Sequence, residues 1–484
     1  MIEDIRISLS DGESAAFDLA IIGAGPAGIT LARELSGRGL RIALLEAGGM
    51  DAPGPEARAL YDGDVVGLPY PLAASRQRFF GGTSNHWGGW CRPMDPLDFE
   101  DRAWMPLGGW PLSREDLDEF YARAHGVLEI DSDDYQVTQH TEAGTTLPAD
   151  ERTGFRNSAF RFSPPLRFRS AFADELAASE DVTVFLNATV VNLEHDSGTV
   201  GAATVRTLEG AEYRIRAGRF VLATGGLEVP RLLLHTKSGE LPALGNRSGF
   251  VGRCFMEHFG YTPGYLLTRA GLKYFRHADI NGHSIMPVLA PRPELIRAKQ
   301  LNNCCVLLTA AEPDADWPPG ALKTPGLARN LGPSAWRYRV TMINEPTPNP
   351  ESRVTLSDSR DALGMCRLVL DWQIMQRDLD SVERTVRELV RWLGRDGLGR
   401  VQFSRPISPE TTERFTGGMH HMGTARMSAD PEHGVVDTDC KVHGTSNLYV
   451  ASSAVFSASG YSNPTLSIVA LSLRLAEHLK EARA

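Results

Sequence analysis

Three glycines and a glutamate near the N-terminus form the clearest chemical pattern in the chain. Gly23, Gly25 and Gly28 make a GxGxxG motif between an apolar run and a helical segment, and Glu46 ends the next apolar run. In that setting the first glycine permits a tight turn, the second lets the backbone approach a pyrophosphate, and the third lets the helix pack against the strand. The start of the helix offers free N–H groups to phosphate, and Glu46 can accept hydrogen bonds from ribose hydroxyls. The pattern predicts a dinucleotide site, and its place at the very start of a long chain favours FAD over NAD.

A strand, a helix and a second strand must position this motif. Residues 17–23, FDLAIIG, form a continuous apolar run that is typical of a buried parallel strand. The next residues predict a turn that enters a helix, with Gly39 near the end of that helix. Residues 41–49, RIALLEAGG, predict the second strand. The unit is βαβ, and the fold class it predicts is α/β with a Rossmann-type dinucleotide-binding domain.

The rest of the chain predicts further strands and helices, and its 484 residues exceed what one core usually serves, so we expect two domains. The expected strands cover residues 181–196, 211–226, 301–310, 335–344, 352–358 and 447–453. The expected helices are one that Ser113 caps, one over 228–239, a long one over 378–397 with a 3.6-residue apolar period, and one over 463–481. The block from about 263 to 410 is the candidate second domain, with a sheet-and-helix (α+β) fold.

Composition and charge exclude several classes of partner. The net charge of −10 gives no basic surface for nucleic acid or for an anionic membrane, and no apolar stretch approaches the ~20 residues of a membrane helix. The first residues lack the basic start of a signal peptide, so we expect a cytoplasmic protein. The six cysteines form no CxxC pair, so we expect reduced thiols and no metal site.

Four segments resemble the glucose–methanol–choline (GMC) oxidoreductase family. They are FGGTSNHWGGW at 80–90, MHHMGTARM at 419–427, GVVDTDCKVHGTSNLYVASSAVF at 434–456, and SGYSNPTLSIVALSLRLAEHL at 459–479. Weaker matches are ATGGLEVPRLLL, VGRCFMEH and PNPESRVTLSD, and residues 263–340 match only loosely. The bacterial sugar-oxidising branch, which includes pyranose oxidase, is the most similar, because it shares the HxMG and NPT patterns.

This resemblance implies an FAD enzyme whose flavin domain is discontinuous in sequence. The expected FAD-binding domain comprises residues 1–110, 155–262 and 411–484. The expected substrate-binding domain comprises residues 111–154 and 263–410. By position in the motifs, His420 matches the family's catalytic histidine and Asn463 its second member, with His421 as the alternative if the register shifts by one.

The chemistry of alcohol oxidation agrees with this pair. A hydride leaves carbon readily only when the hydroxyl proton has gone, and a neutral imidazole with a pKa of about 6.5 can take that proton. Asn463 can hold the same oxygen, and the helix expected to start at Pro464 can direct its positive end to the flavin. We therefore expect flavin reduction to weaken as the pH falls and His420 protonates.

The resemblance also assigns residues to the flavin. Besides the GxGxxG motif and Glu46, the expected contacts are Gly81, Gly82, Asn85, His86, Val190, Ser452, Pro464 and Thr465. His86 has two alternative roles: it carries the flavin covalently, as the matching histidine does in pyranose oxidases, or it only packs against it. Ser452 stands where many family members have aspartate, and a serine can still bind phosphate. The side chains of Trp87, Trp90, His258 and His443 are expected to be structural or to pack on the flavin.

The function expected from these observations is oxidation of a CH–OH group by hydride transfer to FAD. The expected substrate is a small-molecule alcohol such as a sugar, glycoside or polyol, with an aryl or other polar alcohol as the alternative, and oxygen or a quinone as the electron acceptor. A second hypothesis is a non-redox lyase of the same family. Further hypotheses are an NAD(P)H-dependent flavoprotein hydroxylase and a flavin-binding sensor, and the HHMGTARM and NPT segments argue against the hydroxylase.

Overall fold

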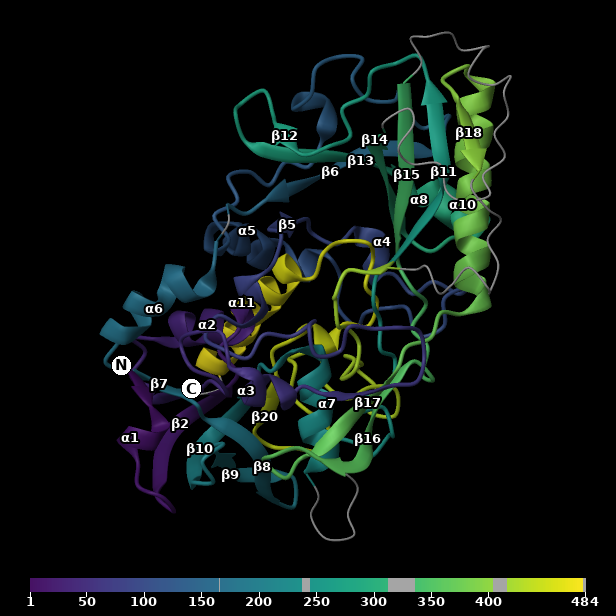
Figure 1. The fold of residues 1–484 in the computed structure, drawn as a ribbon. Coiled ribbons are helices and arrows are strands. Elements are labelled where there is room, and N and C mark those ends of the chain that lie inside the picture. The colour runs from purple at the N-terminus through teal and green to yellow at the C-terminus, as the bar shows by residue number, and fades with distance from the viewer. Residues whose placement is uncertain (165, 237–243, 312–335, 404–415, 482–484) are drawn as a thin grey trace.

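The computed structural model describes residues 1–164, 166–236, 244–311, 336–403 and 416–481, which form two large sheets and one small one (Figure 1). The expected domain boundary at 410/411 lies outside these residues, as do the end of the helix expected over 228–239 and the first residue of the strand expected over 335–344. Within the described ranges, none of the helices combines the length and hydropathy that crossing a membrane requires.

The first sheet is eight-stranded and mostly parallel. Its order is β1 (Ile2–Asp4), β7 (Val182–Leu186), β3 (Ile42–Leu45), β2 (Ser14–Ile22), β10 (Glu212–Leu222), β9 (Thr199–Arg206) and β8 (Thr189–Asp196), and β20 (Leu448–Val450) pairs with β10. Helix α2 (Pro26–Leu35) connects β2 to β3, so the predicted βαβ unit is confirmed. The last four residues of β2 and all of β3 are buried, as a continuous apolar run in a parallel sheet requires.

Four parallel strands of this sheet end level with one another. Ile22 is in register with Leu45 on one side and Leu222 on the other, and Leu222 is in register with Val450. The residues that follow these strand ends therefore meet at one edge of the sheet. In open α/β sheets this carboxyl edge is where ligands bind.

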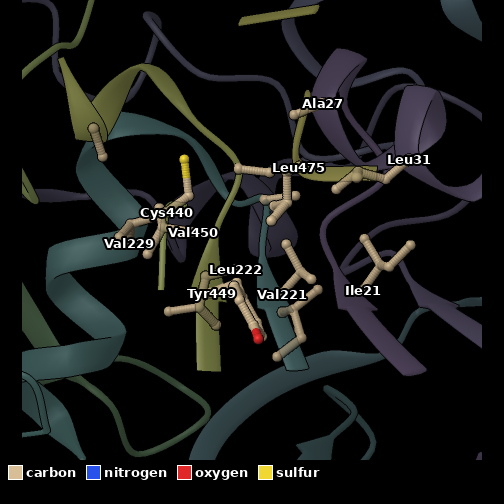
Figure 2. Close-up of a cluster of buried hydrophobic side chains, with 14 of the residues drawn as sticks. Ile21, Ala27, Leu31, Val221, Leu222, Val229, Cys440, Tyr449, Val450 and Leu475 are labelled. Carbon is tan, nitrogen blue, oxygen red and sulfur yellow. The ribbon is translucent and has the colours of Figure 1, made fainter. Parts of the chain in front are cut away.

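Segments from both ends of the chain build the core of this sheet. Figure 2 shows buried side chains of β2, α2, β10, α7 (Gly225–His235), β20 and α11 (Thr465–Glu481) in one cluster. Helix α11 lies beside α2 and also packs on α5 (Asp118–Val127), as the yellow and purple ribbons in Figure 1 show. The helix expected from Ser113 begins with a 3₁₀ turn at Glu115–Leu117 before it becomes α5.

The second sheet is nine-stranded and antiparallel. Its order is β18 (Arg400–Phe403), β11 (Phe259–Thr268), β15 (Trp336–Asn344), β14 (Cys304–Ala310), β13 (Ser284–Pro291), β6 (Phe155–Phe162) and β5 (Trp90–Cys91), with β12 (His277–Ala278) on β13 and β19 (Thr416–Gly417) on β11. Helix α10 (Gln376–Arg395) buries Leu379, Val382, Val386 and Leu389 in one core cluster with side chains of β14 and β15. The predicted sheet-and-helix part is confirmed, and with it the fold class.

A small third sheet orders β16 (Arg353–Arg360), β17 (Cys366–Asp371) and β4 (Gly63–Val65), beside α7. The remaining α-helices among the described residues are α1 (Ile5–Ser8), α3 (Pro55–Ala59), α4 (Pro96–Phe99), α6 (Phe168–Ala178) and α8 (Pro293–Lys299). The expected division into two domains stays a prediction. Three pairings cross its boundaries: β6 pairs with β13, β4 pairs with β17, and the first residues of β11 pair with β15.

Candidate active site

A cavity of about 360 Å³ lies at the carboxyl edge of the first sheet. Its walls come from the ends of β2, β3, β10 and β20, from residues 76–90, from residues 418–421, and from the start of α11. Of the residues predicted for the site, the cavity is lined by Gly23, Gly25, Glu46, Gly82, His86, Val190, His420, His421, Ser452, Asn463, Pro464 and Thr465. Gly28, Gly81 and Asn85 contact residues that line it: a Cβ on Gly28 would meet Gly23, Gly81 donates to the carbonyl of Ala24, and Asn85 donates to that of Gly82.

The GxGxxG turn has the geometry that its glycines predict. Gly23 has a φ of +106°, in the left-handed region. A Cβ on Gly28 would lie 1.9 Å from the carbonyl oxygen of Gly23, so only glycine lets α2 pack this close to β2. A Cβ on Gly25 would meet nothing within 4 Å, because this residue faces the cavity. The backbone there is open to a ligand, at the start of a helix that has no side-chain cap.

Glu46 and Thr224 extend this end of the cavity. The Glu46 carboxylate accepts hydrogen bonds from the N–H of Ala24 (3.1 Å) and of Gly48 (2.8 Å), and burial raises its pKa. The hydroxyl of Thr224 is buried in the cavity wall and has no hydrogen-bond partner among the described residues. An orphaned hydroxyl and an open glycine turn beside a buried carboxylate fit the diphosphate and ribose of a dinucleotide.

Residues 80–90 contact the glycine turn, where the N–H of Gly81 donates to the carbonyl of Ala24 (2.8 Å). Gly81 and Gly82 have φ values of +92° and +52°, and a Cβ on Gly82 would lie 3.0 Å from the Cα of Gly25. The side chain of Asn85 closes the loop by donating to the carbonyls of Phe80 and Gly82 (3.0 and 2.9 Å). Small residues therefore bring two backbone segments together at the cavity.

His86 is exposed on the same loop. Its Nδ1 lies 2.9 Å from the side-chain amide nitrogen of Gln77, and both residues line the cavity. Burial, followed by the charge of Arg167, lowers the pKa of His86. A neutral histidine in the cavity wall suits either of the two roles expected for it.

The segment that carries His420 is fixed by a buried carboxylate. Glu257 accepts hydrogen bonds from the backbone N–H of Gly418 (2.9 Å) and of His420 (2.8 Å), and the hydroxyl of Tyr70 donates to it (2.8 Å). Burial raises the pKa of Glu257 to about 7. A Cβ on Gly418 would lie 2.6 Å from the ring of His420, so the imidazole rests directly on this glycine.

His258 contacts the predicted base itself. Its Nδ1 lies 3.0 Å from Nδ1 of His420, and its Nε2 lies 2.9 Å from the carbonyl oxygen of Gly460. Burial lowers the pKa of His258 to about 4 and that of His420 well below 6.5, and the neighbouring histidines add to the shift of His420. Sequence reasoning missed Glu257 and grouped His258 with structural residues. The signal was the adjacent Glu–His pair in the weakly matching VGRCFMEH segment.

His421 has different partners from His420. Its Nε2 lies 3.0 Å from the hydroxyl of Ser75, and its ring packs against Tyr70 and Phe255. Burial lowers its pKa to about 3. Both histidines line the cavity, but Nε2 of His421 is engaged by the hydroxyl of Ser75, whereas His420 contacts His258 through its Nδ1.

Asn463 and Pro464 lie at the cavity where α11 begins. The N–H of Ile468 donates to the carbonyl of Pro464 (2.8 Å), so the proline caps α11, whose first residue is Thr465, one position after the predicted start. The hydroxyl of Ser462 donates to the carbonyl of Pro93 (2.9 Å), which fixes the residue before Asn463. Among the described residues, no group of three or more His, Cys, Asp or Glu side chains could hold a metal ion.

Comparisons with known proteins identify the kind of enzyme. The GMC oxidoreductase family model matches residues 348–472, and the FAD dependent oxidoreductase model matches residues 18–251. The chain is 27% identical to 6'''-hydroxyparomomycin C oxidase of Streptomyces lividus, over 97% of this chain and 93% of that protein. It is 24% identical to the fructose dehydrogenase large subunit of Gluconobacter japonicus, over 96% and 98%, and 26% identical to C-glycoside 3-oxidase of Microbacterium trichothecenolyticum, over 96% and 97%.

Solved structures share the fold. Pyridoxine 4-oxidase from Mesorbium loti aligns with a TM-score of 0.59 and 18% identity over 95% of this chain and 98% of that one. A formate oxidase structure aligns with a TM-score of 0.58 and 18% identity over 98% and 99%. The prediction of an FAD-dependent alcohol oxidoreductase is confirmed by these matches, and FAD is the cofactor that the glycine turn, Glu46 and Thr224 would hold. The chain thus combines an FAD dependent oxidoreductase domain with a GMC oxidoreductase C-terminal domain.

Proposed function

We propose that this enzyme oxidises a CH–OH group of a sugar, glycoside or polyol to a carbonyl, with His420 as general base and Asn463 as the residue that positions the hydroxyl. The observation that carries the proposal is the neutral, partly buried imidazole of His420 in the wall of the cofactor cavity. FAD, when bound, supplies the acceptor for the hydride. The hydroxyl proton goes to His420, so the substrate loses one hydride and one proton.

The environment of His420 supports its role as base. Its low pKa keeps the imidazole neutral at ordinary pH, so a lone pair is available to accept the hydroxyl proton. Its backbone is tied to Glu257 and its ring rests on Gly418, so the base is held in one orientation. Pre-organisation of this kind lowers the entropy cost of the reaction.

Asn463 and α11 support the other half of the reaction. A side-chain amide can donate a hydrogen bond to the substrate oxygen without adding charge, and it stabilises that oxygen as negative charge develops. Asn463 stands at the start of α11, whose N-terminus carries partial positive charge. Negative charge that builds up in the cavity is therefore stabilised from this side.

The substrate class rests on the names of the relatives. They include a C-glycoside oxidase, a fructose dehydrogenase and a paromomycin-type oxidase, so a polar, sugar-like alcohol is favoured over an aryl alcohol. Both oxidases and a dehydrogenase occur among them, so oxygen and a quinone are both candidate acceptors. Trp87 and Trp90 line the cavity and offer flat apolar surfaces to a sugar ring.

The test is anaerobic reduction of the FAD-loaded protein by sugars, glycosides, polyols and aryl alcohols, followed by absorbance. We expect one polar class to bleach the flavin, and oxygen or a quinone to restore the colour. His420→Ala should slow this reduction by about 10²–10⁴-fold, whereas the matched His421→Ala should cost much less. If His421→Ala loses flavin reduction and His420→Ala retains it, the base is His421. A loaded enzyme that no alcohol bleaches would refute the oxidation and favour the lyase reading.

Denaturation separates the two roles of His86. Flavin colour that stays with the polypeptide after acid precipitation, and disappears from it in His86→Ala, identifies a covalent link. Flavin that is released into the supernatant identifies His86 as a packing residue.

A further inference from the structure

We propose that His258 is a positioning residue that determines which ring nitrogen of His420 carries the proton, so that Nε2 of His420 is the basic atom. This inference rests on the proposed function, because it concerns how the proposed base is prepared. It assigns a role to a histidine that the sequence groups with structural side chains. The main support is a chain of contacts from His420 through His258 to the backbone of Gly460.

The carbonyl of Gly460 sets the first proton in this chain. A carbonyl oxygen only accepts hydrogen bonds, and Nε2 of His258 lies 2.9 Å from it, so Nε2 of His258 carries the hydrogen. His258 is 2% exposed and neutral, and a neutral imidazole has one N–H. Its Nδ1 is therefore an acceptor.

The second proton follows from the first. Nδ1 of His420 lies 3.0 Å from the acceptor Nδ1 of His258, with the two rings nearly perpendicular at 83°. Two acceptors at this distance repel, so Nδ1 of His420 carries the hydrogen and donates it. Nε2 of His420 is left with a lone pair for the hydroxyl proton of the substrate. When His420 becomes a cation, its hydrogen bond to His258 strengthens, which stabilises the charge.

A buried ion pair holds the carbonyl end of the chain. Glu345 accepts from the N–H of Gly460 (3.1 Å) and forms a two-point pair with Arg102 (2.7 and 2.8 Å). Glu345 is fully buried and Arg102 is 1% exposed. Buried pairs of this kind add little net stability because both charges lose their hydration, so a positioning role agrees with their presence.

Gly460 is suited to be the fixed point. Its φ is +54°, and a Cβ there would lie 2.3 Å from a carboxylate oxygen of Asp98, so the backbone is held closely from this side. Gly460 lies three residues before Asn463 in the chain. One anchored segment therefore orients both proposed catalytic residues, His420 through His258 and Asn463 through the backbone.

The test compares His258→Asn with His258→Leu in the FAD-loaded enzyme. The Asn Oδ1 replaces Nδ1 of His258 as an acceptor, and Leu has similar size without an acceptor. The ¹⁵N spectrum of labelled histidine, with His420 assigned from its loss in His420→Gln, reports which nitrogen is protonated. We expect Nδ1–H in the wild type and in His258→Asn, and a loss of this preference in His258→Leu. Flavin reduction should fall about ten- to a hundredfold in His258→Leu and less in His258→Asn.

The outcomes separate this proposal from the proposed function. If the spectrum of the wild type shows the proton of His420 on Nε2, the tautomer assignment is wrong. This measurement needs no variant, so it tests the assignment even if His258→Leu fails to fold. Unchanged His420 signals in a folded His258→Leu protein also overturn it. Unimpaired flavin reduction in His420→Ala would instead overturn the proposed function, whatever the spectrum shows.

Discussion

The two ends of the cavity are built by different means. The glycine-turn end consists of backbone from one βαβ unit, in which Gly23, Gly25, Gly28 and Glu46 lie within 24 consecutive residues. The reactive end consists of side chains from distant segments, since His258 and His420 are 162 residues apart and His258 and Gly460 are 202 residues apart. At the glycine-turn end, glycines without side chains leave backbone N–H groups open to a ligand. At the reactive end, the imidazoles lie in segments that buried carboxylates hold in place.

This difference separates binding from chemistry. A change at the glycine turn should alter cofactor retention and leave the reduction rate of loaded enzyme unchanged. A change at the reactive end should do the reverse.

Gly28→Ala should abolish FAD binding, because its methyl group would lie 1.9 Å from the carbonyl oxygen of Gly23 and α2 could not pack on β2. Gly25→Ala is the matched control, since its methyl group meets no protein atom within 4 Å. Gly25→Ala should fold, as circular dichroism will report, and bind FAD about 10- to 100-fold more weakly because the methyl enters the cavity. Equal FAD retention in both variants would contradict the geometry of the turn.

Asn463→Asp should slow flavin reduction by about 10²–10³-fold while FAD stays bound, because a carboxylate would repel the negative charge that develops on the substrate oxygen. Stopped-flow reduction and the flavin content of the same sample provide the measurement. Asn463→Ser, which keeps a neutral donor, is the control and should lose less. If the Asp variant reduces as fast as the wild type, Asn463 does not contact the reacting oxygen.

Glu46→Gln should weaken FAD binding about tenfold, because its carboxylate accepts from two backbone N–H groups and an amide can satisfy only one of them at its oxygen. Titration of the apoprotein with FAD measures this effect. The reduction rate of the loaded fraction should match that of the wild type. A slower reduction rate in the loaded fraction would show that the glycine-turn end of the cavity also affects the chemical step.

The smallest effect concerns pH. Because burial lowers the pKa of His420 well below 6.5, the imidazole stays neutral as the pH falls to that value, and reduction should stay level between about pH 8 and 6.5. The rate should fall only in more acidic solution, where His420 protonates. A pH–rate profile that falls with a midpoint near 6.5, the pKa of an ordinary exposed histidine, would show that the base is more hydrated than the structure indicates. The sequence alone predicts this higher midpoint, and burial accounts for the difference.

The sequence predicts the local end of the cavity better than the distant one. The βαβ unit, the burial of its strands and the geometry of Gly23 and Gly28 follow from residues close in the chain, and all are confirmed. At the other end, motif resemblance brings His420 and Asn463 to the cavity wall. It does not reveal that Glu257 binds the backbone of the His420 segment or that Glu345 binds the backbone of Gly460. In both cases the carboxylate and its partner are more than 100 residues apart, so no short sequence motif contains both. For the same reason, the pairing of β6 with β13 was not foreseen.

The position of β20 and α11 governs when this enzyme becomes complete during its synthesis. Strands β2 and β10 leave the ribosome early, but β20 must pair with β10, and α11 must pack on α2 more than 400 residues after α2 was made. Until then the first sheet has an open edge and an uncovered apolar helix face, the kind of surface on which chaperones act. The residues proposed for catalysis, His420 and Asn463, arrive in the same late segment. Oxidation by a partly made chain is therefore prevented by the order of synthesis itself.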